Sequence, residues 1–146
     1  MPGEWQHTLT HHPDGLRRTV SWLVWQAIGA GDTGTGGGPE HNVFPRVLGT
    51  ARLISLMELA AARAMEPMLR PGELTAGIVV RIEHVAPTPL GGTVRMTARY
   101  LGREGKHHRF EVIAADDAGE TFRGQHIRAV VEARRLEKGA SRRLRV

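Results

Sequence analysis

Cysteine is absent from the 146 residues of this chain. Disulfide bonds, thiolate nucleophiles and cysteine-ligated zinc are therefore excluded, and a reducing compartment is compatible with the sequence. No apolar run approaches the roughly eighteen residues of a membrane-spanning helix, and the first residues lack the basic and apolar regions of a signal peptide. We expect a soluble, cytoplasmic protein with one domain spanning residues 1–146 and no membrane partner.

Acidic residues are outnumbered, with 15 Asp and Glu against 20 Lys and Arg, which gives a net charge of +5. The excess lies at the C-terminus, where residues 135–146 form a basic tail, while the rest of the chain is nearly balanced. Aromatic residues make up only 5% of the chain, and no helix-turn-helix, aromatic ladder or zinc finger is evident. Nucleic acid is therefore disfavoured as a partner, and binding through the tail stays an alternative.

Glu58 is the most informative side chain. Hydrophobic spacing predicts a helix over residues 50–69, stopped by Pro71-Gly72. At 100° per residue, the neighbours of Glu58 on the helical wheel are apolar: Ala51, Ile54, Ala61, Ala62 and Met65. A carboxylate in such a place is costly unless a donor or cation compensates it, and carboxylates of this kind carry acid, base or nucleophilic chemistry. The alternative is a structural glutamate, hydrogen-bonded or facing a solvent groove.

Alternating apolar residues predict strands after this helix. In residues 76–85 the apolar positions Ala76, Ile78, Val80 and Ile82 share one face with His84. Further strands are expected over 93–101, 107–115 and 121–134, with a possible earlier strand near residues 5–11 and an ambiguous apolar run at 20–28. The order predicts an α+β fold in which an antiparallel meander curls around a long central helix.

Two further features carry no predicted site. The glycine-rich segment 29–38 is followed by Pro39-Glu40-His41 and lacks the lysine of a phosphate-binding loop, so it reads as a flexible loop. The histidine groups His7/His11/His12 and His107/His108 lack a third ligand at matching spacing, so no metal is predicted.

Several spaced motifs together resemble the hotdog fold and, within it, the fluoroacetyl-CoA thioesterase-like family. They are Val43-Phe44-Pro45, the Ala-Arg-hydrophobic-x-x-Leu-Met-Glu run at 51–58, Pro71-Gly72-Glu73, His84-x-Ala86-x-Thr88-Pro89 and Gly124-x-His126-x-Arg128-Ala129-Val130. The likeness covers about residues 43–136. Residues 1–42 diverge, and their glycine-rich loop looks like an insertion.

The resemblance implies a thioester hydrolase with Thr50, Glu58 and His84 as catalytic residues. It implies a homodimer with sites at the interface, an acyl-CoA substrate, and no cofactor besides the coenzyme A within that substrate. Either the Glu58 carboxylate attacks the thioester carbonyl, or His84 deprotonates the attacking water, because imidazole titrates near neutral pH. Thr50 would orient Glu58 or steady the developing charge.

The resemblance also assigns substrate-binding roles to Phe44, Gly77 and Arg128. Gly77 could instead be a strand glycine that admits the helix, and Arg128 a surface residue. His41 stands where the fluoroacetate-specific member has a second aromatic lid residue, so we expect a short or medium acyl group. A non-catalytic hotdog protein that binds acyl-CoA or a small apolar ligand, and a hotdog dehydratase, stay as alternatives.

Helix geometry restricts the catalytic set. Eight residues of straight helix separate Thr50 from Glu58 by about 12 Å, which is too far for a hydrogen bond. Thr50 must therefore lie in a bent entry to the helix or act from a second subunit.

Overall fold

The computed structural model describes residues 4–11, 17–26, 47–89 and 91–144. The helices are α1 (Thr50–Met65) and α2 (Ala133–Arg142), and a 3-10 turn, named η1 (Glu66–Met68), directly follows α1. The strands are β1 (Glu4–His11), β2 (Arg17–Gln26), β3 (Glu73–His84), β4 (Thr93–Glu104), β5 (His107–Asp116) and β6 (Gly119–Glu132). In these ranges no helix is long and apolar enough to cross a membrane.

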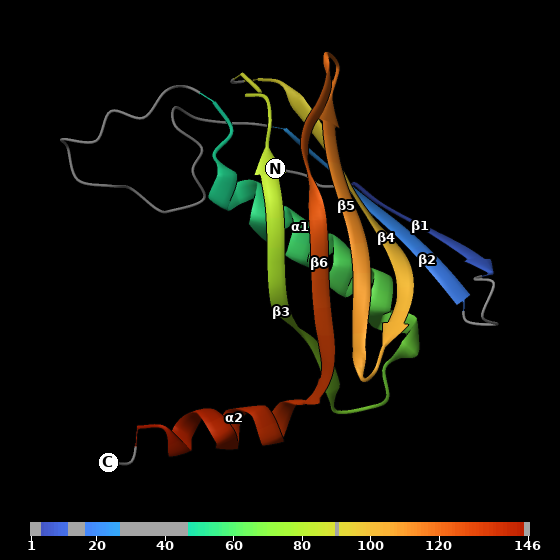
Figure 1. Ribbon diagram of the computed structural model, residues 1–146, viewed down its shortest axis with the longest axis vertical. Coiled ribbons are helices and arrows are strands. Elements are labelled where there is room, and N and C mark those ends of the chain that lie inside the picture. The colour runs from blue at the N-terminus through green and yellow to red at the C-terminus, as the bar shows by residue number, and fades with distance from the viewer. Residues whose placement is uncertain (1–3, 12–16, 27–46, 90, 145–146) are drawn as a thin grey trace.

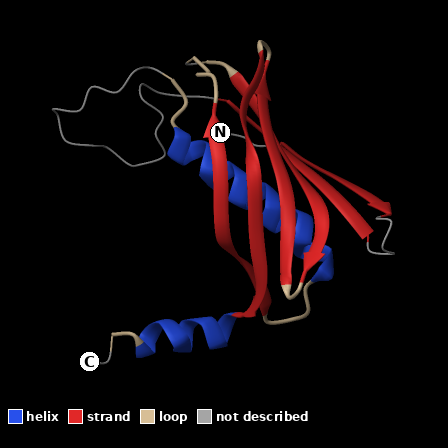
Figure 2. Cartoon of the chain, viewed as in Figure 1, coloured by secondary structure: helices blue, strands red, loops and turns tan. Residues whose placement is uncertain are grey.

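All six strands form one antiparallel sheet in the order β1-β2-β4-β5-β6-β3, and α1 crosses one of its faces (Figures 1 and 2). The predicted α+β class and the helix-on-sheet arrangement are confirmed. The predicted meander is wrong for β3, which pairs with β6 at the far edge and not with β4, the next strand along the chain. The segment after β3 carries the chain across the sheet, because its prolines and glycines interrupt strand pairing.

The core lies between α1 and the sheet. The buried residues of α1 recur every three or four positions: Leu53, Leu56, Met57, Ala60, Ala61, Ala64 and Met65. They pack against inward side chains of the sheet, including Met96, Tyr100, Phe110 and Phe122. Each large apolar side chain buried in this way contributes about 1.5–3 kcal/mol.

One face of α1 is open within a single chain. Ala51, Ser55 and Leu59 are exposed, and Glu58 lies beside them. The sequence pattern predicted a helix covered on most sides, which is wrong for one protomer. The helix also ends earlier than predicted, at Met65, because Pro67 has no backbone N–H to donate and η1 follows instead.

A bulge divides β3 into two parts, and the alternation of side chains between the two faces of the sheet shifts by one residue from one part to the other. Gly77 pairs with Arg128 and Val79 with Ile127, which leaves Ile78 without a partner. Val80 and His84 share a face, as predicted, and His84 on this face contacts Thr50 of α1. On the N-terminal side of the bulge, Gly77 and Thr75 take the positions on this face. The predicted placement of Ala76 on the same face as His84 is therefore wrong, because the extra residue Ile78 shifts the two-residue alternation by one.

The outer edge of β3 is unpaired in the described part of the chain. It is twelve residues long and presents exposed apolar side chains, Ile78 and Val80 among them. Long edge strands of this kind are templates for pairing with another chain. The structure therefore offers an open strand edge beside the open face of α1.

Candidate active site

Thr50 and His84 form a hydrogen-bonded pair. Thr50 is the first residue of α1 and His84 the last of β3, and the Oγ1 and Nδ1 atoms are 2.8 Å apart. The Nε2 atom of His84 is buried and has no hydrogen-bond partner among the described residues. The imidazole is thus held through one nitrogen, and the other can accept or deliver a proton.

The segment that follows β3 brings these two residues together. The backbone N–H of Leu48, two residues before Thr50, donates to the Thr88 carbonyl at 2.9 Å. Thr88 is itself buried, and its hydroxyl donates to Asp116 at 2.8 Å. The start of α1 is therefore tied to the chain that leaves β3, which fixes Thr50 beside His84.

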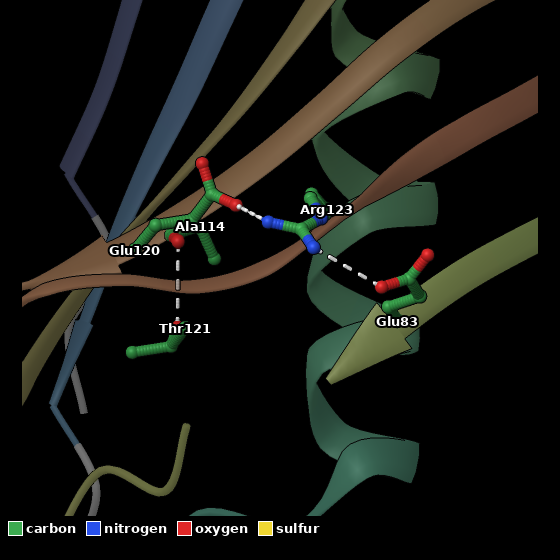
Figure 3. A network of polar contacts seen from close by, with 5 residues as sticks. All are labelled: Glu83, Ala114, Glu120, Thr121 and Arg123. Carbon is green, nitrogen blue, oxygen red and sulfur yellow. Dashed lines mark hydrogen bonds and ion pairs between the residues drawn. The ribbon is translucent and has the colours of Figure 1, made fainter. Parts of the chain in front are cut away.

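Polar contacts on the outer face hold the same end of β3 against β6. Arg123 lies between Glu83 and Glu120, with N–O distances of 3.2 and 2.9 Å (Figure 3). The Thr121 carbonyl accepts the backbone N–H of Val85 at 2.7 Å. The two strands are thus joined on either side of His84, which limits its movement.

A cavity of about 220 Å³ lies at this end of β3, lined by His84, Val85, Ala86 and Pro87. A larger hollow of about 550 Å³ opens on the outer face of the sheet between β3, β5 and β6. It is lined by ion-paired side chains such as Glu83 and Arg123 and contains neither Glu58 nor His84. The smaller cavity is therefore the better candidate for a reacting group.

Glu58 lies in a second polar cluster, on the middle of α1. A Cβ atom added to Gly77 would overlap Glu58 Oε1, and it would lie 2.9 Å from His126 Cε1 and 3.3 Å from Arg128 Nη1. Glu58, His126 and Arg128 therefore surround Gly77. The surface interpretation of Arg128 is wrong, because this residue is only 5% exposed, while the substrate-binding roles of Gly77 and Arg128 stay predictions.

A short hydrogen-bond network fixes this second cluster. His126 Nδ1 is 2.8 Å from the Val79 carbonyl oxygen and so donates to it, while its Nε2 lies 3.1 Å from Arg128 Nη1 and accepts. Arg128 also donates to the Thr75 hydroxyl and carbonyl, at 3.0 and 2.7 Å. The guanidinium is thus held in one orientation beside Glu58.

Burial shapes the charges of this network. It lowers the pKa of His126, which nearby Arg128 lowers further, against the opposing effects of the Val79 hydrogen bond and the Glu58 charge. Burial also lowers the pKa of Arg128, and the Glu58 carboxylate opposes this shift. A neutral His126 that accepts from a cationic Arg128 is consistent with both directions.

The two clusters are separate within one chain. Gly77 and His84 lie seven residues apart on β3, which corresponds to roughly 20 Å. The helix begins at Thr50 and continues past Glu58, so no bent entry brings those two residues together. The structure therefore unites Thr50 with His84, and Glu58 with Gly77 and Arg128, but does not unite the two groups.

The patterns in the sequence predicted no role for His126 or Thr75. His126 belongs to one of the motifs on which the family resemblance depends. It lies two residues from Arg128 on a strand, and this spacing indicates that both side chains lie on the same face. Thr75 carried no signal, because the bulge decides its facing. Phe44 and His41 lie outside the described residues, and in the described ranges no three His, Asp or Glu side chains gather as a metal site needs.

Comparison with known proteins identifies close relatives. The family model of the fluoroacetyl-CoA-specific thioesterase matches residues 35–134. A fluoroacetyl-CoA thioesterase of Streptantibioticus cattleyicolor is 42% identical over 100 residues, which cover 68% of this chain and 70% of the relative. A mutant of the fluoroacetyl-CoA-specific thioesterase, solved with fluoroacetate and CoA, matches with a TM-score of 0.75 and 31% identity over 84% of this chain and 98% of that one.

A hot-dog-like protein from Thermanaerovibrio acidaminovorans matches with a TM-score of 0.74 and 24% identity, over 86% of this chain and 90% of that one, and shows the fold alone. The predicted hotdog fold is confirmed, and so is the predicted class of acyl-CoA thioester hydrolase. This chain belongs to the fluoroacetyl-CoA-specific thioesterase family.

Proposed function

We propose that this protein hydrolyses short or medium acyl-CoA thioesters as a homodimer whose two active sites are each shared between the subunits. The observation that carries the proposal is the separation of Thr50 and His84 from Glu58 within one chain. Each half is ordered by its own contacts, and the buried Nε2 of His84 still lacks a partner among the described residues. Family membership supports the reaction, and a second subunit would complete the site.

A two-fold axis at the free edge of β3 would join the halves. The midpoint between Gly77 and His84 falls between Val80 and Arg81, on the unpaired side of the strand. Antiparallel pairing about this point would place His84 opposite Gly77 of the partner subunit, and therefore near the partner subunit's Glu58. The exposed edge residue Ile78 would be covered, and two-fold dimers are the commonest soluble homo-oligomers.

Two routes of hydrolysis fit such a site. In the first, His84 Nε2 takes a proton from water, the resulting hydroxide attacks the thioester carbonyl, the C–S bond breaks, and the imidazolium returns the proton to the thiolate. In the second, a Glu58 oxygen attacks the carbonyl and releases the thiolate, and water then hydrolyses the mixed anhydride. Thr50 would hold Nδ1 in either route, and both routes use only side chains and water. We expect this reaction in the cytoplasm.

The reaction is tested by the release of free thiol from a panel of acyl-CoAs. We expect turnover by the wild type and losses of about 100-fold or more in Glu58→Gln and His84→Ala. Glu66→Gln is a matched control, because it makes the same change at an exposed position of the same helical region. An inert wild type that binds acyl-CoA tightly would select the non-catalytic alternative, and full rates in both variants would refute the mechanism.

Mixing the two inactive variants tests whether the site is shared. A dimer of one Glu58→Gln and one His84→Ala subunit contains one intact site if the site crosses the interface, and none if it does not. Random mixing should restore about a quarter of the wild-type rate, because half the dimers are mixed and each has one good site. No recovery after verified subunit exchange would show that the residues act within one chain.

A further inference from the structure

α2 carries a basic stripe along one side. The stripe consists of three basic residues at four-residue spacing, Arg134, Lys138 and Arg142. Arg135 lies next to them on the helical wheel. All four are exposed, and the only acid in the helix is Glu137. The predicted basic tail is thus an ordered helix with its charges on one face, over a length of about 12 Å.

The opposite side of α2 is apolar and uncovered. Leu136 and Ala140 lie there, and Leu136 is 46% exposed. A ten-residue helix is marginal in water unless an apolar face packs against something. The described residues supply little cover, because every residue from Arg134 to Arg142 is exposed. We therefore expect the apolar side of α2 to pack against a surface outside the described residues of this chain.

The position of α2 indicates which surface this is. The backbone N–H of Ala133 donates to the Gly72 carbonyl at 3.0 Å, so α2 begins beside the start of β3. From there it projects past the unpaired edge of β3, away from the rest of the sheet (Figure 1). That edge is where the second subunit is proposed to pair, and Gly77 lies only four residues, about 13 Å, along β3 from Glu73.

We propose that the basic stripe of α2 binds the phosphate groups of the coenzyme A thioester that enters the shared site. In the proposed dimer, α2 begins beside the segment that follows His84 of the partner subunit, and its apolar side packs on that subunit. Coenzyme A holds its pyrophosphate and 3′-phosphate at a distance from the thioester, at the far end of the pantetheine arm. Several cations in a row, near the site but outside it, complement that charge distribution.

This inference rests on the proposed function and is tested by comparing two substrates. Acyl-CoA and the matching acyl-pantetheine share the reacting thioester, but only acyl-CoA carries the pyrophosphate and 3′-phosphate. In the double variant Arg134→Gln/Lys138→Gln we expect kcat/KM for acyl-CoA to fall about tenfold, mainly through KM, with acyl-pantetheine unaffected. Arg103→Gln/Lys106→Gln removes the same charge from the end of β4 and the turn that follows it, and should leave kcat/KM for both substrates unchanged.

A binding measurement separates this inference from the reaction itself. Titration of the full chain with adenosine 3′,5′-bisphosphate, followed by calorimetry, needs no turnover. Binding should weaken about tenfold in the α2 variant and decline with salt in the wild type.

Each outcome decides one of the two proposals. An inert wild type that still binds the bisphosphate through α2 would refute hydrolysis and keep the phosphate site. Equal effects of the α2 variant on both substrates, or none on either, would overturn the phosphate site and leave hydrolysis standing. An α2 variant that loses affinity for an oligonucleotide, but keeps its affinity for the bisphosphate, would instead assign the stripe to nucleic acid.

Discussion

Replacing Gly77 with alanine should inactivate the protein without unfolding it. The added Cβ would overlap Glu58 Oε1 and would lie 2.9 Å from His126 Cε1. Both atoms belong to side chains, and the Glu58 oxygen is at the end of a flexible one, so the carboxylate can move away. Gly77 has no positive φ, so the backbone accepts alanine without strain. The substitution therefore displaces the carboxylate by roughly 1 Å, and a misplacement of that size can lower a rate about 100-fold.

The assay is thiol release together with thermal unfolding. We expect kcat/KM to fall about 100-fold, and the melting temperature to stay close to that of the wild type. Stability should change little because alanine restricts the unfolded chain by about 0.4–1 kcal/mol, which offsets part of the crowding. Gly139→Ala is the control, since its Cβ would meet nothing within 4 Å. A fully active, folded Gly77→Ala protein would refute the requirement for Glu58 at this place.

Three further substitutions or conditions test the packing around the site. In Gly124→Ala the Cβ would overlap the Arg81 carbonyl, a backbone atom that cannot move without separating β3 from β6, so we expect a loss of about 3 kcal/mol in urea unfolding. Burial lowers the pKa values of His108 and His126 below 6.5, so the unfolded chain binds more protons below that pH. The free energy of unfolding should then fall on acidification below pH 6.5, by at most about 1.4 kcal/mol per pH unit for each histidine, and His126→Gln should flatten the profile. Tyr100→Phe removes the buried hydroxyl 2.9 Å from His108 Nδ1 and should cost about 1–3 kcal/mol; an unchanged unfolding midpoint would contradict that contact.

Local patterns in the sequence predicted the elements but not the contacts between them. The helix and its start at Thr50, the strand near residues 5–11 and the three strands from β4 to β6 all follow from residue spacing, and the structure has them with shifted ends. The pairing of β3 with β6 joins residues about fifty positions apart, and no two-residue or 3.6-residue period encodes such a partner. The contact between Thr50 and His84 depends on that same long-range arrangement.

The charged tail and the buried arginine show a different limit. Composition marks residues 135–146 as basic, but it does not show that residues 133–142 form a helix that continues directly from the end of β6. Arg128 has the residue type of a surface position, yet it is buried because His126 and Thr75 satisfy its donors. In both cases residue type gives the average behaviour, and neighbouring residues from other elements decide the outcome.

The bulge at Ile78 links the fold to the proposed chemistry. Gly77 and His84 are an odd number of residues apart, so in a regular strand they would face opposite sides of the sheet. The unpaired Ile78 shifts the alternation by one, and both residues therefore face α1. Because both residues face α1, antiparallel pairing of two β3 edges places His84 of one subunit and Gly77 of the other on the same side of the joined sheet. Glu58 lies beside Gly77, so it is brought to that side as well. The irregularity that sequence periodicity could not predict is thus the feature on which a shared active site depends.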